Sequence, residues 1–180
     1  NSAAAAIAPR PTLRYTDREM NEPSAFIGID IASGRLPFTF AVLDTSRKLL
    51  ASGEGSLEDV LAYCAGLKSA VAAVNAPDLA AVRPGETPEA ELARRGLRLP
   101  RLVPGKSLPA RLQKAAALYE RLAGLGYVPF TGLEGEKSWL EANCEAVYWA
   151  WIGQPALDSR AFEGRLQRTA VLYEHDLPVG

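Results

Sequence analysis

The chain has 180 residues, of which 48% are hydrophobic and 23% are charged, and its formal net charge is -1. This length and composition suit one globular domain with a sizeable buried core. The small net charge excludes a strong overall field that would draw the whole molecule to nucleic acid or to anionic lipid. No apolar run in the sequence approaches the roughly 20 residues of a membrane span, so we expect no membrane partner.

The N-terminal segment and the cysteines bear on processing and on the cellular compartment. The globular pattern begins just after Met20, so we interpret residues 1–19 as a leader, with a flexible N-terminal arm as the alternative. Cys64 and Cys144 lie far apart and fit no metal-ligand spacing. They therefore favour two buried thiols in a reducing compartment over a disulfide. We expect a cytoplasmic protein.

Three strands are expected at the start of the domain, over residues 25–31, 36–43 and 48–52. They are apolar and β-branched, and short turns join them, which predicts an antiparallel meander. Asp30 lies inside the otherwise apolar first run. A buried carboxylate is costly unless a partner compensates it, and a cation is the usual partner. The first strand is therefore interpreted as one half of a metal or phosphate site.

The remainder of the chain alternates helices with strands. This order predicts an α/β fold with a mixed five-stranded sheet, in which three antiparallel strands are followed by parallel strands, with helices on both faces. In such folds a site sits at the carboxyl ends of the strands, near a switch in strand order. The expected helices cover residues 56–67, 87–95, 107–124, 145–152 and 159–174, and the remaining strands cover 71–74 and 137–142.

Polar residues terminate or interrupt three of the predicted strands, namely Asp30, Asn75 and Glu141, with Asp78 just beyond the second. Oxygen ligands gathered on neighbouring strands suit Mg²⁺ or Mn²⁺. Two such ions can hold the attacking and leaving oxygens of a phosphodiester. The alternative is that Asp30 caps a turn and Glu141 is a solvated strand end, and spacing alone does not decide between the two.

Five sequence blocks occur in order between about residues 25 and 175, and they read FIGIDIASG, VAAVNAPDL, ELARRG, LEANCEAVYWAWIG and EGRLQRTAVL. Their order and spacing resemble the family known as domain of unknown function 429, described as predicted nucleases with a ribonuclease H-like fold. The resemblance implies a single ribonuclease H-like domain over residues 20–180. It also implies that Asp30 anchors a metal site and that Glu141 supplies a second acid.

The chain departs from the family pattern at two implied site positions. The fourth strand of the family commonly ends Ile-Asp-Ala-Pro, whereas residues 74–77 read Val-Asn-Ala-Pro, so Asn75 replaces an acid. The acid at 141 is followed by Ala-Asn-Cys rather than by Val-x-Pro. An amide still offers a carbonyl oxygen but removes one negative charge. Asp78 is a candidate substitute ligand, and we expect at most one weakly held Mg²⁺ or Mn²⁺ and impaired hydrolysis.

Arginines form the second candidate set. The interval from Arg94 to Arg121 is rich in arginine and lysine, with Glu120 as its sole acid, and it includes Arg94, Arg95 and Arg111. Guanidinium groups bind phosphate in a fork, so these residues are candidate phosphate or nucleic-acid ligands. The alternative is a helix end at which the dipole favours arginine. Arg165 and Arg168 match the Gly-Arg-x-x-Arg pattern of the family, and the resemblance adds them to the set.

Three functions are compatible with these features. The first is a divalent-metal-dependent nuclease or phosphodiesterase of ribonuclease H-like type, with Asp30, Asn75 and Glu141 as its catalytic residues and nucleic acid or a small phosphate ester as substrate. The second is a catalytically inactive module that binds nucleic acid or a phosphate ligand on the same fold. The third is a structural or interaction protein that forms a homodimer through the tryptophan-containing helix.

Overall fold

The structure is a computed structural model that describes residues 24–32, 34–79, 92–94, 96–97, 107–132 and 137–179, and every structural statement below concerns these residues. The expected leader and most of the expected helix over residues 87–95 lie outside them. In chain order the elements are β1 (Phe26–Ile31), β2 (Phe38–Leu43), β3 (Leu49–Gly55), α1 (Leu57–Gly66), β4 (Ala70–Val74), α3 (Ala110–Gly124), β5 (Val128–Pro129), β6 (Lys137–Glu141), α4 (Cys144–Ile152) and α5 (Phe162–Glu174).

The strands form one mixed sheet with the order β3-β2-β1-β4-β6-β5. The first three strands are antiparallel neighbours, and β4, β6 and β5 continue the sheet with parallel pairing. The predicted antiparallel meander followed by parallel strands is confirmed. The predicted number of five strands is wrong, because β5 adds a sixth. This strand has only two residues, too few for side-chain alternation to reveal it in a sequence.

Burial alternates along β1, so its two faces have different surroundings. Ile27, Ile29 and Ile31 are buried, whereas Gly28 and Asp30 between and beside them are exposed. Successive side chains of a strand point to opposite faces of the sheet, so one face of β1 enters the core and the other does not. The prediction of a buried Asp30 carboxylate is therefore wrong, because the apolar run around it belongs partly to an open face.

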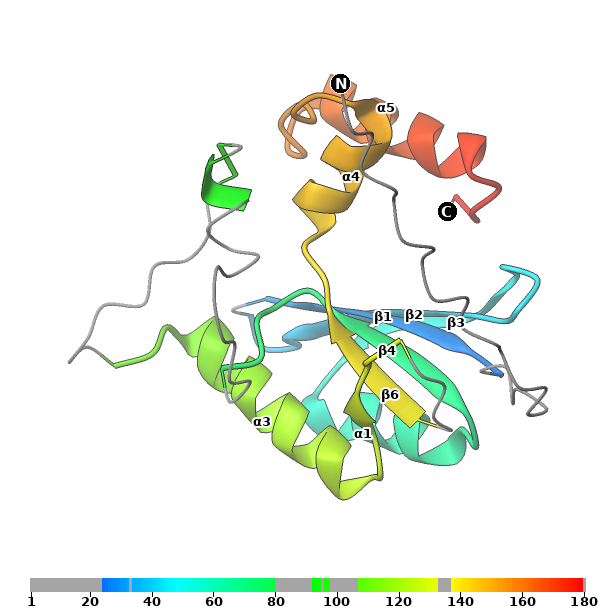
Figure 1. Ribbon diagram of the computed structural model, residues 1–180, viewed down its shortest axis with the longest axis vertical. Coiled ribbons are helices and arrows are strands. Elements are labelled where there is room, and N and C mark those ends of the chain that lie inside the picture. The colour runs from blue at the N-terminus through cyan, green and yellow to red at the C-terminus, as the bar shows by residue number, and fades with distance from the viewer. Residues whose placement is uncertain are drawn as a thin grey trace, which may run out of the picture.

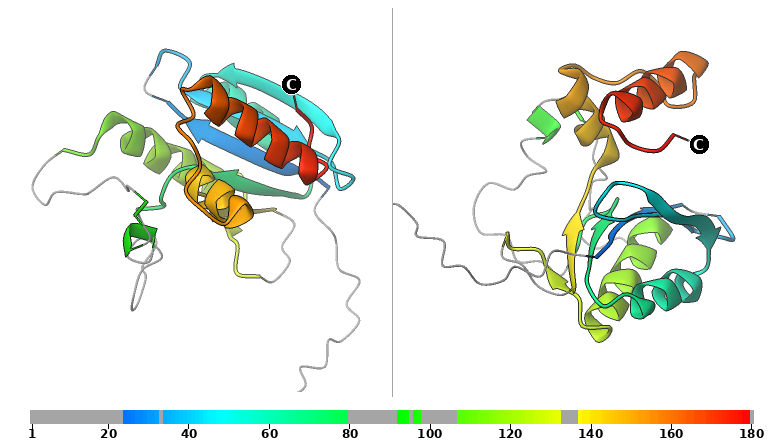
Figure 2. Two further views of the ribbon diagram at one scale, coloured as in Figure 1. Left: turned by 90° about the horizontal axis from the view of Figure 1, so that it is seen from above. Right: turned by 90° about the vertical axis from the view of Figure 1, so that its right-hand side faces the viewer.

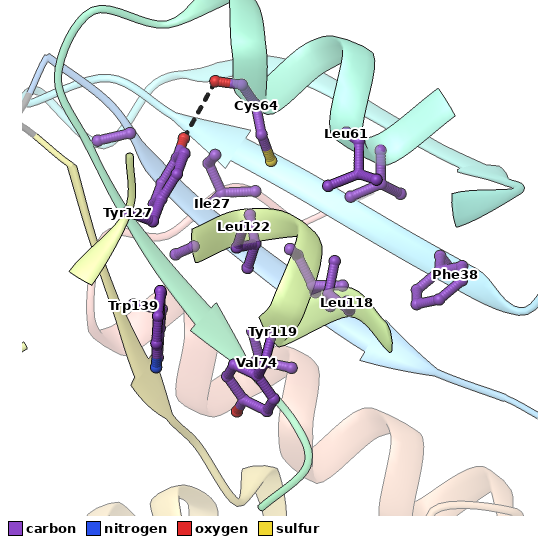
Figure 3. Packing of buried hydrophobic residues seen from close by; sticks show 14 of the residues in the cluster. Ile27, Phe38, Leu61, Cys64, Val74, Leu118, Tyr119, Leu122, Tyr127 and Trp139 are labelled. Carbon is purple, nitrogen blue, oxygen red and sulfur yellow. Dashed lines mark hydrogen bonds between the residues drawn. The ribbon is translucent and has the colours of Figure 1, made fainter. Parts of the chain in front are cut away.

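Helices α1 and α3 cover the core face of the sheet (Figures 1 and 2). The helix α1 begins as predicted, with a capping box between Ser56 and Asp59. The core side chains meet between these helices and the strands, and the Tyr127 hydroxyl donates a hydrogen bond of 3.2 Å to the Cys64 carbonyl oxygen (Figure 3). This bond satisfies a phenol that is almost fully buried.

Helices α4 and α5 lie on the other side of the sheet, beyond the end of β6 (Figure 1). Within the described chain, no helix is long and apolar enough to cross a membrane. The prediction of helices on both sides of the sheet is confirmed. However, α4 and α5 leave part of the second face of the sheet exposed to solvent. Phe26 on that face remains 41% exposed. The two layers are joined by a hydrogen bond of 2.8 Å that the Arg47 guanidinium donates to the carbonyl oxygen of His175, at the end of α5.

Candidate functional site

Asp30 and Asn75 meet at the carboxyl ends of two neighbouring parallel strands. Asp30 is the penultimate residue of β1, and Asn75 directly follows β4. Its backbone N–H donates to the Ile29 carbonyl oxygen at 2.8 Å, which continues the ladder between these strands. The Asn75 side chain donates from Nδ2 to Oδ1 of Asp30, also at 2.8 Å. The structure thus brings together two of the residues that the sequence placed in one site.

The orientation of the Asn75 amide follows from its two neighbours. Its Nδ2 faces the Asp30 carboxylate, and its Oδ1 lies 3.4 Å from the backbone nitrogen of Cys144, the first residue of α4. An ionised carboxylate only accepts hydrogen bonds and a backbone N–H only donates them, so only this orientation of the amide satisfies both. The carbonyl oxygen that was expected to bind a cation beside Asp30 therefore faces helix α4 instead.

Arg111 supplies the positive charge next to Asp30. Its guanidinium lies 3.6 Å from Oδ1 of Asp30, and Nε donates to the Ile31 carbonyl oxygen at 2.8 Å. A second guanidinium nitrogen donates to the Asn75 carbonyl oxygen. One side chain thus holds the ends of both β1 and β4 in a forked geometry that lysine cannot reproduce. An arginine of α3 therefore supplies a compensating positive charge beside this carboxylate.

The position of Arg111 on its helix conflicts with the helix dipole. It is the second residue of α3, a helix whose first turn contains no acid, and Lys114 follows one turn later. Cations are normally disfavoured at a helix N-terminus, where the dipole is already positive. The ammonium of Lys114 lies 3.3 Å from the Gly34 carbonyl oxygen, in the loop after β1. The dipole and these two cations together make this end of the sheet locally positive around one carboxylate.

Glu141 does not join Asp30. The strand register aligns Ile29 with Val74 and Val74 with Glu141, and paired residues on neighbouring strands share a face of the sheet. Ile29 and Val74 are buried in the core, so Glu141 is on the α3 side of the sheet, whereas Asp30 is on the opposite side. The residue that continues the row of Asp30 and Asn75 is Ala142, which directly follows β6.

The other predicted oxygen ligand, Asp78, belongs to the loop that follows β4. Asp78 follows Asn75 by three residues and is half-buried, and the contacts of the Asp30 carboxylate are with Asn75 and Arg111. In the described part of the chain, no group of three or more histidine, cysteine, aspartate or glutamate side chains is arranged to hold a metal ion. These residues do not fit the two-ion arrangement, and no step through a metal follows from them.

The predicted phosphate-binding arginines are distributed over different parts of the structure. Nη2 of Arg168 on α5 donates to both carboxylate oxygens of Glu145 on α4, at 2.7 and 2.9 Å. It also donates to the carbonyl oxygens of Leu157 and Gly164, so it joins the two helices. Arg165 donates to a nearby backbone carbonyl at 3.3 Å. Arg168 therefore has a structural role that occupies its guanidinium.

The remaining pair of predicted arginines is only partly described. Arg94 is exposed at the end of a short helical stretch of residues 92–94. Arg95 lies outside the described residues.

The two cysteines differ in their surroundings, and both are free. Burial raises the pKa of Cys64 to about 11. Cys144 is exposed as a residue, which contradicts the prediction of two buried thiols. Its pKa is nevertheless raised, first because its thiol is partly desolvated and then because the negative charges of Asp30 and Glu145 disfavour a thiolate, while Arg111 opposes them.

We expect one thiol to react with Ellman's reagent in the native protein. Cys144 should react slowly near neutral pH, and its rate should rise with pH because a raised pKa delays formation of the thiolate. Cys64 should react only after unfolding, because it is fully buried. The variant Cys144→Ser is the control and should abolish the native reaction. Two rapidly reacting thiols in the folded wild type would contradict this assignment.

Arg111 is the residue of the site whose role sequence reasoning missed. It was one member of an arginine-rich interval, and no local pattern distinguished it from its neighbours. The signal that was available is its place in the first turn of the helix that begins near residue 107, because a cation there opposes the dipole and needs a compensating partner.

No protein-family model matches the chain, and no curated protein matches its sequence. The ribonuclease H-like fold and the nuclease family therefore remain expectations from the quoted sequence blocks.

Proposed function

We propose that this protein is a binding module for a phosphate-bearing ligand on a ribonuclease H-like fold, and that it binds without metal-dependent hydrolysis. The observation that carries the proposal is the Arg111 guanidinium beside Asp30, where a metal ion would otherwise compensate the carboxylate. It is fixed by backbone carbonyl oxygens at the ends of β1 and β4 while 37% of its side chain remains exposed. A fixed, partly exposed guanidinium is suited to an anionic oxygen.

The surroundings of Arg111 support an anion rather than a cation as ligand. Lys114 and the N-terminus of α3 add positive potential, and α4 begins beside Asn75. Among the residues that the structure describes, Asp30 is the carboxylate that contacts Arg111. The orientation of the Asn75 amide supports the absence of hydrolysis, because its carbonyl oxygen is directed away from Asp30.

The test is fluorescence polarisation with labelled single-stranded RNA and DNA oligonucleotides in EDTA, over a series of salt concentrations. The logarithm of the affinity should fall linearly with the logarithm of salt, by roughly 0.7 per phosphate contact. Lys114→Gln should weaken binding and lower the slope by about 0.7, because one contact is lost. Lys48→Gln, an exposed lysine in the turn between β2 and β3, is the matched control and should leave both unchanged.

The same assay distinguishes nucleic acid from a small phosphate ester. Competition by inorganic phosphate at equal ionic strength would indicate that a single phosphate suffices. Absence of binding at low salt for both oligonucleotides, together with no protection of the protein from thermal unfolding by inorganic phosphate, would overturn the proposal.

A metal-dependent nuclease or phosphodiesterase is the second candidate. It is favoured by the contact of 2.8 Å between Asp30 and Asn75 at the carboxyl ends of adjacent parallel strands, where sites of α/β folds form. Incubating the labelled oligonucleotides with Mn²⁺ in place of EDTA tests it. Cleavage that is lost in Asp30→Asn would replace the binding proposal with this one, whereas intact oligonucleotides support a module that binds only.

A further inference from the structure

Helix α5 has two apolar faces, and only one of them is packed. Gly164 and Val171 are its buried residues, and Arg168 on the same side is held by Glu145 of α4. Phe162, Leu166 and Tyr173 are 66, 57 and 75% exposed. At 100° per residue these three lie on the side of the helix opposite Gly164 and Val171. We call the line Phe162, Leu166, Thr169 and Tyr173 the α5 stripe.

Exposed apolar residues gather in this layer. Seven of the fourteen exposed large hydrophobic residues of the described chain lie after residue 144. Helix α4 contributes Val147 and Trp151, at 39 and 41%, and none of its residues is buried. Scattered single apolar residues on a surface are ordinary, but large apolar residues aligned on one face of a helix, as on α5, are typical of an interaction surface.

The spacing of the α5 stripe indicates another helix as its partner. Its members are separated by four, three and four residues, which is the alternation of a and d positions in a coiled coil. We propose that the α5 stripe is the interface of a homodimer, in which α5 packs antiparallel against α5 of a second copy about a two-fold axis.

The stripe is self-complementary in this arrangement. An antiparallel pair centred between Leu166 and Thr169 places Phe162 against Tyr173 of the second copy, and Leu166 against Thr169, and the two-fold axis repeats both contacts. Aromatic pairs then close both ends of the interface. Antiparallel packing also opposes the two helix dipoles, which parallel packing would align.

The charges beside the stripe are compatible with the antiparallel pair. Arg165 on one edge faces Leu172 of the second copy, and Glu163 on the other edge faces Ala170, so neither charge meets a like charge. The arginine that would be hardest to desolvate, Arg168, lies away from the stripe and is already paired with Glu145. No unpaired charge is buried at the centre of the interface.

The exposed area predicts a dimer that dissociates on dilution. A covered aromatic side chain removes roughly 150–250 Å² from water, and Phe162 and Tyr173 are about two-thirds to three-quarters exposed. With Leu166 the stripe offers roughly 300–400 Å² of apolar surface per chain, below the roughly 800 Å² per partner of a standard stable interface. We therefore expect association in the micromolar range rather than a permanent dimer.

The experiment is sedimentation velocity of the full chain from low micromolar to several hundred micromolar concentration. The wild type should shift from monomer to dimer across this range. Leu166→Glu should remain monomeric throughout, because it places charge beside the two-fold axis. Leu36→Glu is the matched control, since Leu36 is 53% exposed but lies outside α5, and it should dimerise like the wild type.

A variant that strengthens the dimer tests the same antiparallel packing of α5 without the risk that a loss of association reflects unfolding. Thr169→Leu replaces the polar member of the stripe at a place that faces Leu166, so the dimer should tighten by about tenfold or more. Circular dichroism verifies that each variant is folded. A wild type that stays monomeric at every concentration, or a dimer that persists in Leu166→Glu, would overturn the proposal and assign the stripe or the association to another partner or face.

Discussion

Replacing Arg111 with methionine should lower the free energy of unfolding by about 2 kcal/mol. Hydrogen bonds that involve a charged group contribute about 1.5–3 kcal/mol each when buried, and partial exposure of this side chain reduces that value. Methionine leaves the carbonyl oxygens of Ile31 and Asn75 without the donors that join the ends of β1 and β4. Urea unfolding followed by tryptophan fluorescence measures the change.

Two further variants determine which property of Arg111 matters. Arg111→Lys keeps the charge but loses the fork, so it should recover only part of the lost stability. Arg121→Met changes an exposed arginine near the other end of α3 and should alter stability by less than about 0.5 kcal/mol. If Arg111→Met were as stable as Arg121→Met, the hydrogen bonds of Arg111 to the ends of β1 and β4 would contribute nothing to the free energy of unfolding.

The second large effect is expected for Asn75→Asp. The donor that now lies 2.8 Å from Oδ1 of Asp30 becomes a second carboxylate oxygen, so an attraction is replaced by repulsion between like charges. Two unit charges 4 Å apart interact by about 4 kcal/mol at an intermediate effective dielectric. Exposure of Asp30 and the nearby Arg111 reduce this, and we expect a loss of about 2 kcal/mol at neutral pH.

The pH dependence of this variant has a defined sign. Repulsion makes the folded form bind a proton more readily than the unfolded chain, so stability should fall as pH rises through the range in which carboxyl groups ionise. It should recover on acidification. Asn75→Ala, which loses the hydrogen bond without adding charge, should show no such dependence beyond that of the wild type.

The response of the Asn75→Asp variant to Mn²⁺ is a second test of the site. Mn²⁺ can neutralise two adjacent carboxylates, so it should raise the melting temperature of Asn75→Asp and leave that of Asn75→Ala unchanged. A rise of the same size in the wild type would contradict the binding proposal, because it would mean that Asp30 and Asn75 already hold the ion. Equal stability of Asn75→Asp and wild type at every pH would show that the two side chains do not face each other.

Much of the fold was predictable because local patterns specify it. The first three strands follow from apolar β-branched runs separated by short turns, and the start of α1 follows from the capping pair Ser56 and Asp59. The parallel position of β4 follows from the intervening helix, which a crossover connection requires. The extra strand β5 was not predictable, because two residues have no periodicity and only pairing with β6 defines them.

The candidate site was predictable only in part. The sequence placed Asp30 and Asn75 at the ends of neighbouring strands, and the structure brings them into contact. The sequence also placed Glu141 at the end of a strand. Whether Glu141 belongs to the same site as Asp30 depends on which face of the sheet its side chain occupies. A difference of one residue in register reverses the face, and register is set by pairing between distant segments.

The sequence by itself determined most of the succession of strands and helices, and it determined the residue types of the Asp30 and Asn75 pair. These are properties of local pattern and residue type. The tertiary structure alone decided that Asp30 is exposed, that Arg111 lies beside it, and that α5 presents a second apolar face. Each of these depends on contacts between residues far apart in the chain, and such contacts produce no periodic pattern in the local sequence from which they could be predicted.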